Sequence, residues 1–181
     1  MRSGPFALVL LAGCSASAFD SAGQARKAAH GLERAIARSV QLAIDGYNAA
    51  DSDSVPDQLA PGDAAGTLAI TGAIDRGSPT TLRLYVGMAG YADGKISYDT
   101  GTDPSMQPYL QLAIRGGTFT GTLTGSYAMS GELTGDVTID VELVGRATPS
   151  SSGALTRVPG ATVASGTAIT TNGMSDVHLV F

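Results

Sequence analysis

Apolar and polar residues alternate in short runs from Thr67 to the end of the chain, and turn residues separate the runs. Such an alternation places apolar side chains on one face of a β-strand and polar side chains on the other. The longest run has Leu133, Val137, Ile139, Val141 and Leu143 on its apolar face. The pattern predicts about eight antiparallel strands, centred on residues 68–74, 82–88, 96–98, 110–114, 119–127, 133–143, 163–169 and 177–181.

Glycines recur inside the predicted strands. The segment 121–125 (GTLTG) returns as 131–135 (GELTG), and residues 66–72 are a looser copy. Glycine within a strand commonly marks a bulge or a sharp bend. We therefore expect a curved sheet or partial barrel whose concave apolar face needs a second layer to cover it.

Residues 21–48 have a different period and predict one amphipathic helix. Seven residues form its apolar stripe, namely Ala25, Ala29, Leu32, Ile36, Val40, Ala43 and Tyr47. The opposite face carries Lys27, Arg34, Arg38, Gln41 and Asp45. The stripe is narrow and rich in alanine, which favours packing on the sheet over lying on a membrane surface, where bulky apolar residues and several lysines are usual.

Two segments lack periodicity and predict loops. Residues 49–66 contain two prolines and four aspartates, and residues 149–160 are rich in Ser, Gly and Pro. The expected organisation is one globular domain: the helix at 21–48, a loop at 49–66, and the β region at 67–181. Asp51, Asp53 and Asp57 lack the glycine turn and closing carboxylate of a calcium loop, so we interpret them as solvated.

The first residues have the layout of an export signal, with Arg2 ahead of an apolar run at residues 5–12. The run is shorter than the roughly 20 residues that span a bilayer as a helix. It ends in Leu11, Ala12, Gly13 and Cys14, and this segment resembles the lipobox of bacterial lipoproteins. The resemblance implies a signal peptide at 1–13, cleavage between Gly13 and Cys14, acylation of the Cys14 thiol, and a short lipidated tether at 14–20.

The same resemblance implies a location. Ser15 follows the cysteine, and in enteric bacteria a serine there permits transfer to the outer membrane, so we expect an anchor in that membrane with the domain facing the periplasm. The alternative is that Cys14 is an ordinary residue near a general secretory cleavage site. It is the only cysteine, so no internal disulfide can form.

Composition narrows the function classes. The chain has 11 basic and 16 acidic residues, a formal charge of −5. Nucleic-acid binding requires clustered Lys and Arg, which the chain lacks, so no nucleic-acid partner is expected. No phosphate loop, dinucleotide fingerprint or zinc spacing is present either, and we expect no cofactor, no metal and no enzymatic activity.

Three groups of residues are candidates for a catalytic or metal site. Asp176 and His178 share a strand face but have no placed nucleophile, and His30, the other histidine, lies on the polar side of the helix. Residues 99–101 (DTG) are a single copy of a triplet whose protease chemistry needs two carboxylates. The acidic row Glu132, Asp136, Asp140 and Glu142 predicts a solvated outer face.

Three functions remain open. The first is an envelope lipoprotein that binds or carries a lipid-like apolar ligand in a cavity of the curved sheet. The alternative is a structural or adhesive lipoprotein with a solid core and no ligand. A third is an outer-membrane barrel, because Val177, Leu179 and the terminal Phe181 look like the last strand of such proteins, although the chain lacks the aromatic girdles.

Overall fold

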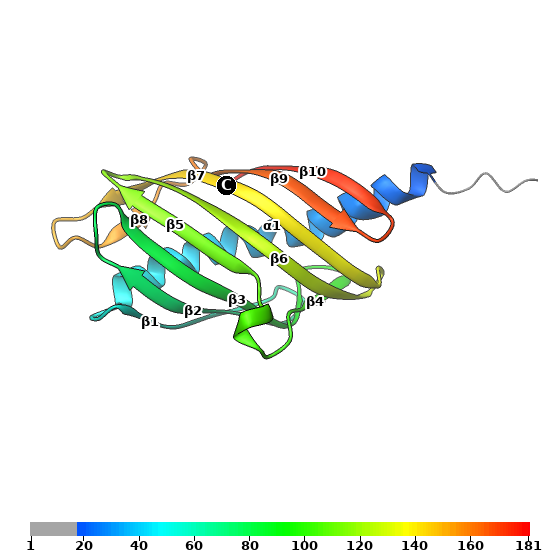
Figure 1. The fold of residues 1–181 in the computed structure, drawn as a ribbon, viewed down its shortest axis with the longest axis horizontal. Coiled ribbons are helices and arrows are strands. Elements are labelled where there is room, and N and C mark those ends of the chain that lie inside the picture. Colours follow the sequence, from blue (N-terminus) through cyan, green and yellow to red (C-terminus); the bar gives the residue numbers. More distant parts are fainter. Residues whose placement is uncertain (1–17) are drawn as a thin grey trace, which may run out of the picture.

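The computed structural model describes residues 18–181, so the predicted signal, Cys14 and Ser15 lie outside the described residues (Figure 1). One helix precedes ten strands and one short 3-10 helix in this part of the chain. The elements are α1 (Ala18–Ala49), β1 (Ser54–Pro61), β2 (Ala65–Asp75), β3 (Thr80–Ala92), β4 (Ile96–Asp99), η1 (Pro104–Met106), β5 (Tyr109–Arg115), β6 (Thr118–Gly131), β7 (Gly135–Pro149), β8 (Leu155–Arg157), β9 (Val163–Thr170) and β10 (Gly173–Val180). Within residues 18–181, no helix is both long and apolar enough to cross a bilayer.

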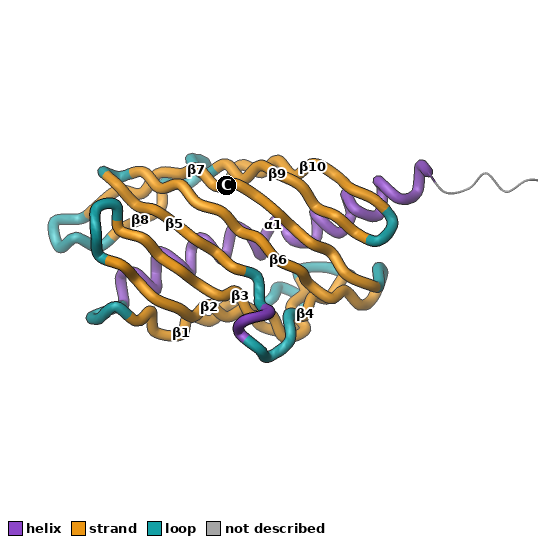
Figure 2. Tube along the Cα trace, in the orientation of Figure 1, coloured by secondary structure: helices purple, strands orange, loops and turns teal. Residues whose placement is uncertain are grey.

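The strands form one antiparallel sheet in the order β1-β2-β3-β4-β6-β7-β9-β10. β5 fills the place between β3 and β6 beyond the end of β4, and β8 pairs with β7. The two ends of this order, β1 and β10, are the edges of the sheet. α1 crosses behind the sheet, as Figures 1 and 2 show. The predicted fold class, a curved antiparallel sheet packed on one helix, is confirmed.

The alternation in the sequence corresponds to the two faces of the sheet. In β7, Val137, Ile139 and Val141 are buried, whereas Asp136 and Asp140 point to solvent. β7 pairs along most of its length with β6, where Phe119 lies opposite Gly145. A Cβ atom at Gly145 would overlap the Phe119 ring, so the glycine leaves the space that this buried ring occupies.

The helix buries a wider face than the predicted stripe. The predicted residues from Ala25 to Ala43 are buried and Tyr47 is partly buried, but five further residues, Ala28, Ala35, Ser39, Ile44 and Gly46, are buried too. The Ser39 hydroxyl donates to the Ala35 carbonyl at 2.8 Å, so this buried polar group is satisfied. α1 contacts both edge strands, β10 and β1, more extensively than it contacts any inner strand. It therefore covers the concave face from edge to edge, and the predicted packing of helix on sheet is confirmed.

Both segments predicted as loops contain a strand, and these predictions were wrong in part. Residues 49–66 include β1, and residues 149–160 include β8. β1 pairs with β2 through its backbone, but among its residues only Val55 is buried, and a bulge lies between Val55 and Gln58. Strands of this kind leave no alternation in the sequence, because backbone pairing rather than side-chain burial defines them.

Candidate binding groove

The space between α1 and the sheet is occupied by side chains. The largest fully buried residues include Tyr91, Tyr98, Tyr127 and Phe119, and they join the helix stripe in one continuous apolar core. Tyr98 and Tyr127 pack edge to face with ring centroids 6.4 Å apart. Burial raises the pKa of both hydroxyls, so both stay neutral. The concave face is therefore filled by the protein's own aromatic and aliphatic groups.

Polar contacts fix the middle of α1 to the sheet. The Tyr98 hydroxyl donates to the Ala28 carbonyl at 2.9 Å. Arg38 donates to the Tyr91 hydroxyl at 3.0 Å, to the Pro61 carbonyl and to the Asp63 carboxylate. The Arg38 hydrogen bond lowers the pKa of Asp63, which keeps this carboxylate ionised. The sequence placed Arg38 on the face opposite the apolar stripe, and its role in joining β1, β3 and α1 was missed.

The C-terminal end of α1 is held in the same way. The Asn48 side chain donates to the Leu155 carbonyl and accepts from the Leu155 amide, both at 2.7 Å. Arg157 donates to Gln41 at 3.2 Å and lies 5.2 Å from the centre of the Phe181 ring. β8 is thus attached to the helix by side chains that lie more than a hundred residues away in sequence.

Several open hollows lie beside α1, and another, of about 420 Å³, lies on the outer face of β5, β6 and β7. Two adjoining hollows of about 440 and 360 Å³ run between α1 and β10, and they share Glu33, His178 and Leu179. We call this surface the α1–β10 groove. Its helix wall includes Arg26 and His30, and its strand wall runs from Asp176 to Phe181.

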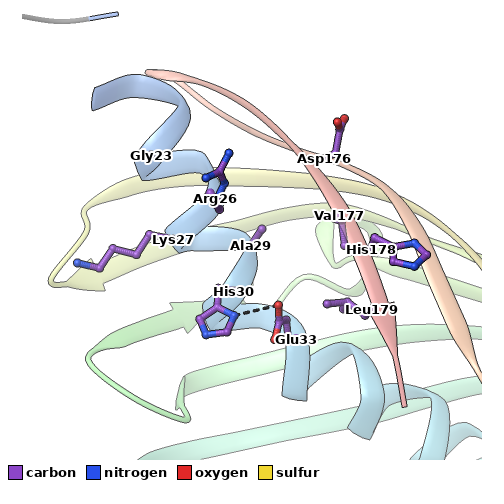
Figure 3. A pocket seen from close by; sticks show the side chains of 10 residues that line it. All are labelled: Gly23, Arg26, Lys27, Ala29, His30, Glu33, Asp176, Val177, His178 and Leu179. Atoms are coloured by element: carbon purple, nitrogen blue, oxygen red, sulfur yellow. Dashed lines mark ion pairs between the residues drawn. The ribbon is translucent and has the colours of Figure 1, made fainter. Parts of the chain in front are cut away.

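Both histidines of the chain line this groove, but they lie on different walls and do not form a site together. Figure 3 shows Val177 and Leu179 pointing toward α1, and Asp176 and His178 pointing away from it. His30 Nδ1 lies 2.9 Å from Glu33 Oε1, and both side chains are well exposed. A chain of nucleophile, base and orienting acid requires direct hydrogen bonds. Among the contacts of residues 18–181, none joins the Asp176 carboxylate to His178 or the two histidines to each other.

The other candidate residues either bond to neighbouring elements of the fold or are exposed to solvent. The Asp99 carboxylate accepts from the Gly90 amide at 2.7 Å, and the Thr100 hydroxyl accepts from the Met88 amide at 2.8 Å, so the 99–101 triplet joins β4 to β3. Glu132 pairs with Lys27, whose hydrogen bond lowers the pKa of Glu132. Within residues 18–181, no three His, Cys, Asp or Glu side chains are grouped closely enough to hold a metal ion. Asp51, Asp53 and Asp57 are exposed.

Comparisons with known proteins give no relative: no family model, no curated protein and no solved structure matches this chain.

Proposed function

We propose that this protein is a non-enzymatic lipoprotein of the bacterial cell envelope, with a solid core and a structural or adhesive role. In this proposal the Cys14 thiol carries the lipid, the anchor lies in the outer membrane, and the domain faces the periplasm. The lipobox-like residues 11–14 support the anchor. The observation that carries the choice of a solid core is the filled space between α1 and the sheet.

The competing proposal, a carrier of an apolar ligand, requires α1 to move away from the sheet. Four of its larger buried side chains, Leu32, Ile36, Val40 and Ile44, would then lose their contacts. Fully burying one such side chain contributes about 1.5 to 3 kcal/mol, so exposing four of them costs on the order of 10 kcal/mol. A domain has a total stability of about 5 to 15 kcal/mol. Opening this interior for a ligand would therefore cost about as much as unfolding the domain, which favours the solid core.

The proposed anchor also constrains the orientation of the domain. Cys14 precedes the first helical residue, Ala18, by four residues. An extended chain advances at most about 3.6 Å per residue, so the start of α1 would lie within about 15 Å of the lipid. The turn between β9 and β10 lies beside this end of the helix, where Asn172 donates to Gln24 at 2.7 Å. We propose that this end of the domain faces the membrane.

Lipid analysis tests the solid core against the carrier. Residues from Ser15 onward are expressed in a bacterial envelope behind an ordinary cleavable signal, purified without detergent, and extracted with organic solvent for mass spectrometry. We expect a folded protein with no lipid near one molecule per chain. A lipid recovered at one molecule per chain would reject the solid core and support the carrier.

A further inference from the structure

The backbone of β10 has hydrogen-bonding groups without strand partners. The Thr162 and Phe181 amides each donate to the other's carbonyl at 3.1 and 3.0 Å, so this is a hydrogen-bonded pair. Such pairs alternate along an antiparallel ladder. Given the register of β9 with β10, the odd-numbered residues 173–181 bond to β9. The amides and carbonyls of Met174, Asp176, His178 and Val180 therefore point toward the open edge, beside the α1–β10 groove.

The two edges of the sheet differ in how they are protected. β1 carries Pro56, Pro61 and a bulge, three features that discourage another strand from pairing with an edge. β10 has the sequence GMSDVHLV, and it pairs with β9 in continuous register without proline, lysine or a bulge. An edge that carries neither proline nor a bulge keeps its amides and carbonyls in position for strand addition.

The outward side chains of β10 form a pattern that is complementary to itself. Met174 and Val180 are apolar and exposed, at 58% and 61%, and they lie at opposite ends of the strand. Asp176 and His178 lie between them on the same face. If this series is set against the same series in reverse, Met174 lies opposite Val180 and Asp176 lies opposite His178. Apolar side chains then meet apolar side chains, and a carboxylate meets an imidazole.

We propose that β10 pairs antiparallel with β10 of a second copy of this chain, about a two-fold axis at Val177. In this register Met174 lies opposite Val180 of the second copy, and Asp176 lies opposite His178 of the second copy. All four residues whose amides and carbonyls lack a strand partner then pair with the second copy. A shift of the axis by one residue would place Asp176 opposite itself, and like charges directly opposite each other are unfavourable. A shift in the other direction would place His178 opposite itself and Asp176 opposite Val180, so the pairing of carboxylate with imidazole would be lost.

The pairing also makes continuous two patches of apolar side chains that are exposed in the single chain. On the outer face, Ile169 of β9 lies beside Met174, and Val144 and Val163 continue the row from Val180. Ile169 and Val144 are 47% and 58% exposed. In the dimer these two short patches join across the axis into one apolar row, which occurs twice by symmetry. The interface is isologous, as a two-fold dimer requires.

The mass of the full chain in mild detergent, measured by analytical ultracentrifugation, tests the dimer with a matched pair of variants. Wild type is expected at twice the monomer mass. His178→Pro removes an amide that points to the open edge and leaves the ladder to β9 intact, so the mass should fall to that of one chain. His178→Ala keeps the amide and should remain dimeric. A monomeric wild type, or a His178→Pro variant that is folded and still dimeric, would overturn the proposal.

Cysteine pairing in the envelope tests the register even if the proline variant is poorly folded. Two differently tagged full chains are co-expressed, one with Asp176→Cys and the other with His178→Cys. Directly opposite residues of a hydrogen-bonded pair have Cα atoms about 5.5 Å apart, within disulfide range. Two chains with the same variant would bring the cysteines only to about 7–8 Å, the diagonal spacing. A disulfide is expected only between the two different tags, and the absence of that product, or equal products within each tag, would reject this register.

Discussion

The Gly31→Ala variant is expected to lose about 1 to 3 kcal/mol of unfolding free energy, the cost of forcing extra volume into a packed core. Alanine normally stabilises a helix interior relative to glycine by about 1 kcal/mol. Here the added Cβ would overlap the hydroxyl oxygen of Tyr98 and lie 3.1 Å from its Cζ atom. Tyr98 is fully buried and its hydroxyl is bonded to Ala28, so the ring has little freedom to move. Urea unfolding measures the effect.

Gly23 on the same helix provides the matched control. A Cβ there meets no atom within 4 Å. Gly23→Ala should therefore stabilise the domain by up to about 1 kcal/mol, the opposite sign. In the double variant Gly31→Ala with Tyr98→Phe, the overlapping oxygen is gone, and the cost should be smaller than the sum of the two single changes. If Gly31→Ala were as stabilising as Gly23→Ala, the close packing of α1 on β4 would be contradicted.

The Cys14→Ala variant is expected to abolish membrane attachment through lipid and to accumulate as an uncut precursor. Each buried methylene of an acyl chain contributes about 0.8 kcal/mol to membrane binding, and stable attachment needs more than one chain. The charge of −5 gives no compensating attraction to anionic lipid. Membrane fractionation, with metabolic labelling by a radioactive fatty acid, measures both effects.

Ser15→Ala is the control for the anchor, because it changes the neighbouring residue and leaves the thiol. It should be labelled and sedimented with membranes like wild type. Cys14→Ala protein of mature size that still sediments with membranes would contradict the lipid anchor, and would point to an ordinary secretory cleavage followed by another mode of attachment.

The fold was predictable where side-chain burial defines the structure. The alternation of Val137, Ile139 and Val141 with acidic residues identified the longest strand, and the helical stripe through Leu32 and Ile36 identified the face of α1. Both patterns arise because burying apolar groups is the main favourable contribution to folding.

The features that the sequence did not predict depend mostly on contacts between residues far apart in the chain. β1 is defined by backbone pairing with β2, and its exposed side chains carry no periodic signal. Arg38 was placed correctly on the polar side of the helix, but its bonds to Tyr91 and Asp63 depend on how β1 and β3 meet the helix. Ser39 was outside the predicted stripe, and its burial costs little because its hydroxyl donates to the Ala35 carbonyl within the helix.

The α1–β10 groove and the open edge of β10 could not be predicted from the sequence for the same reason. Which residues of β10 face the edge follows from its register with β9, and this register is set by the short turn at residues 171–172. Val177, Leu179 and Phe181 were grouped in the sequence as an apolar strand face. Their neighbours Asp176 and His178 were candidates for a catalytic pair. In the proposed dimer they instead belong to the outward face of β10, which pairs with the same face of a second copy.

Amide hydrogen exchange along α1 is the most direct test of the central claim that this helix is part of a solid core and not a lid over a cavity. Elements of a core exchange only through global unfolding, whereas lids open locally at lower free energy. If α1 is part of a solid core, the slowest amides of residues 28–44 are expected to exchange with the same free energy of opening as the slowest amides of β6 and β7. If the whole helix exchanged through a much cheaper opening while β6 and β7 stayed protected, α1 would be a lid, and the solid core would be contradicted.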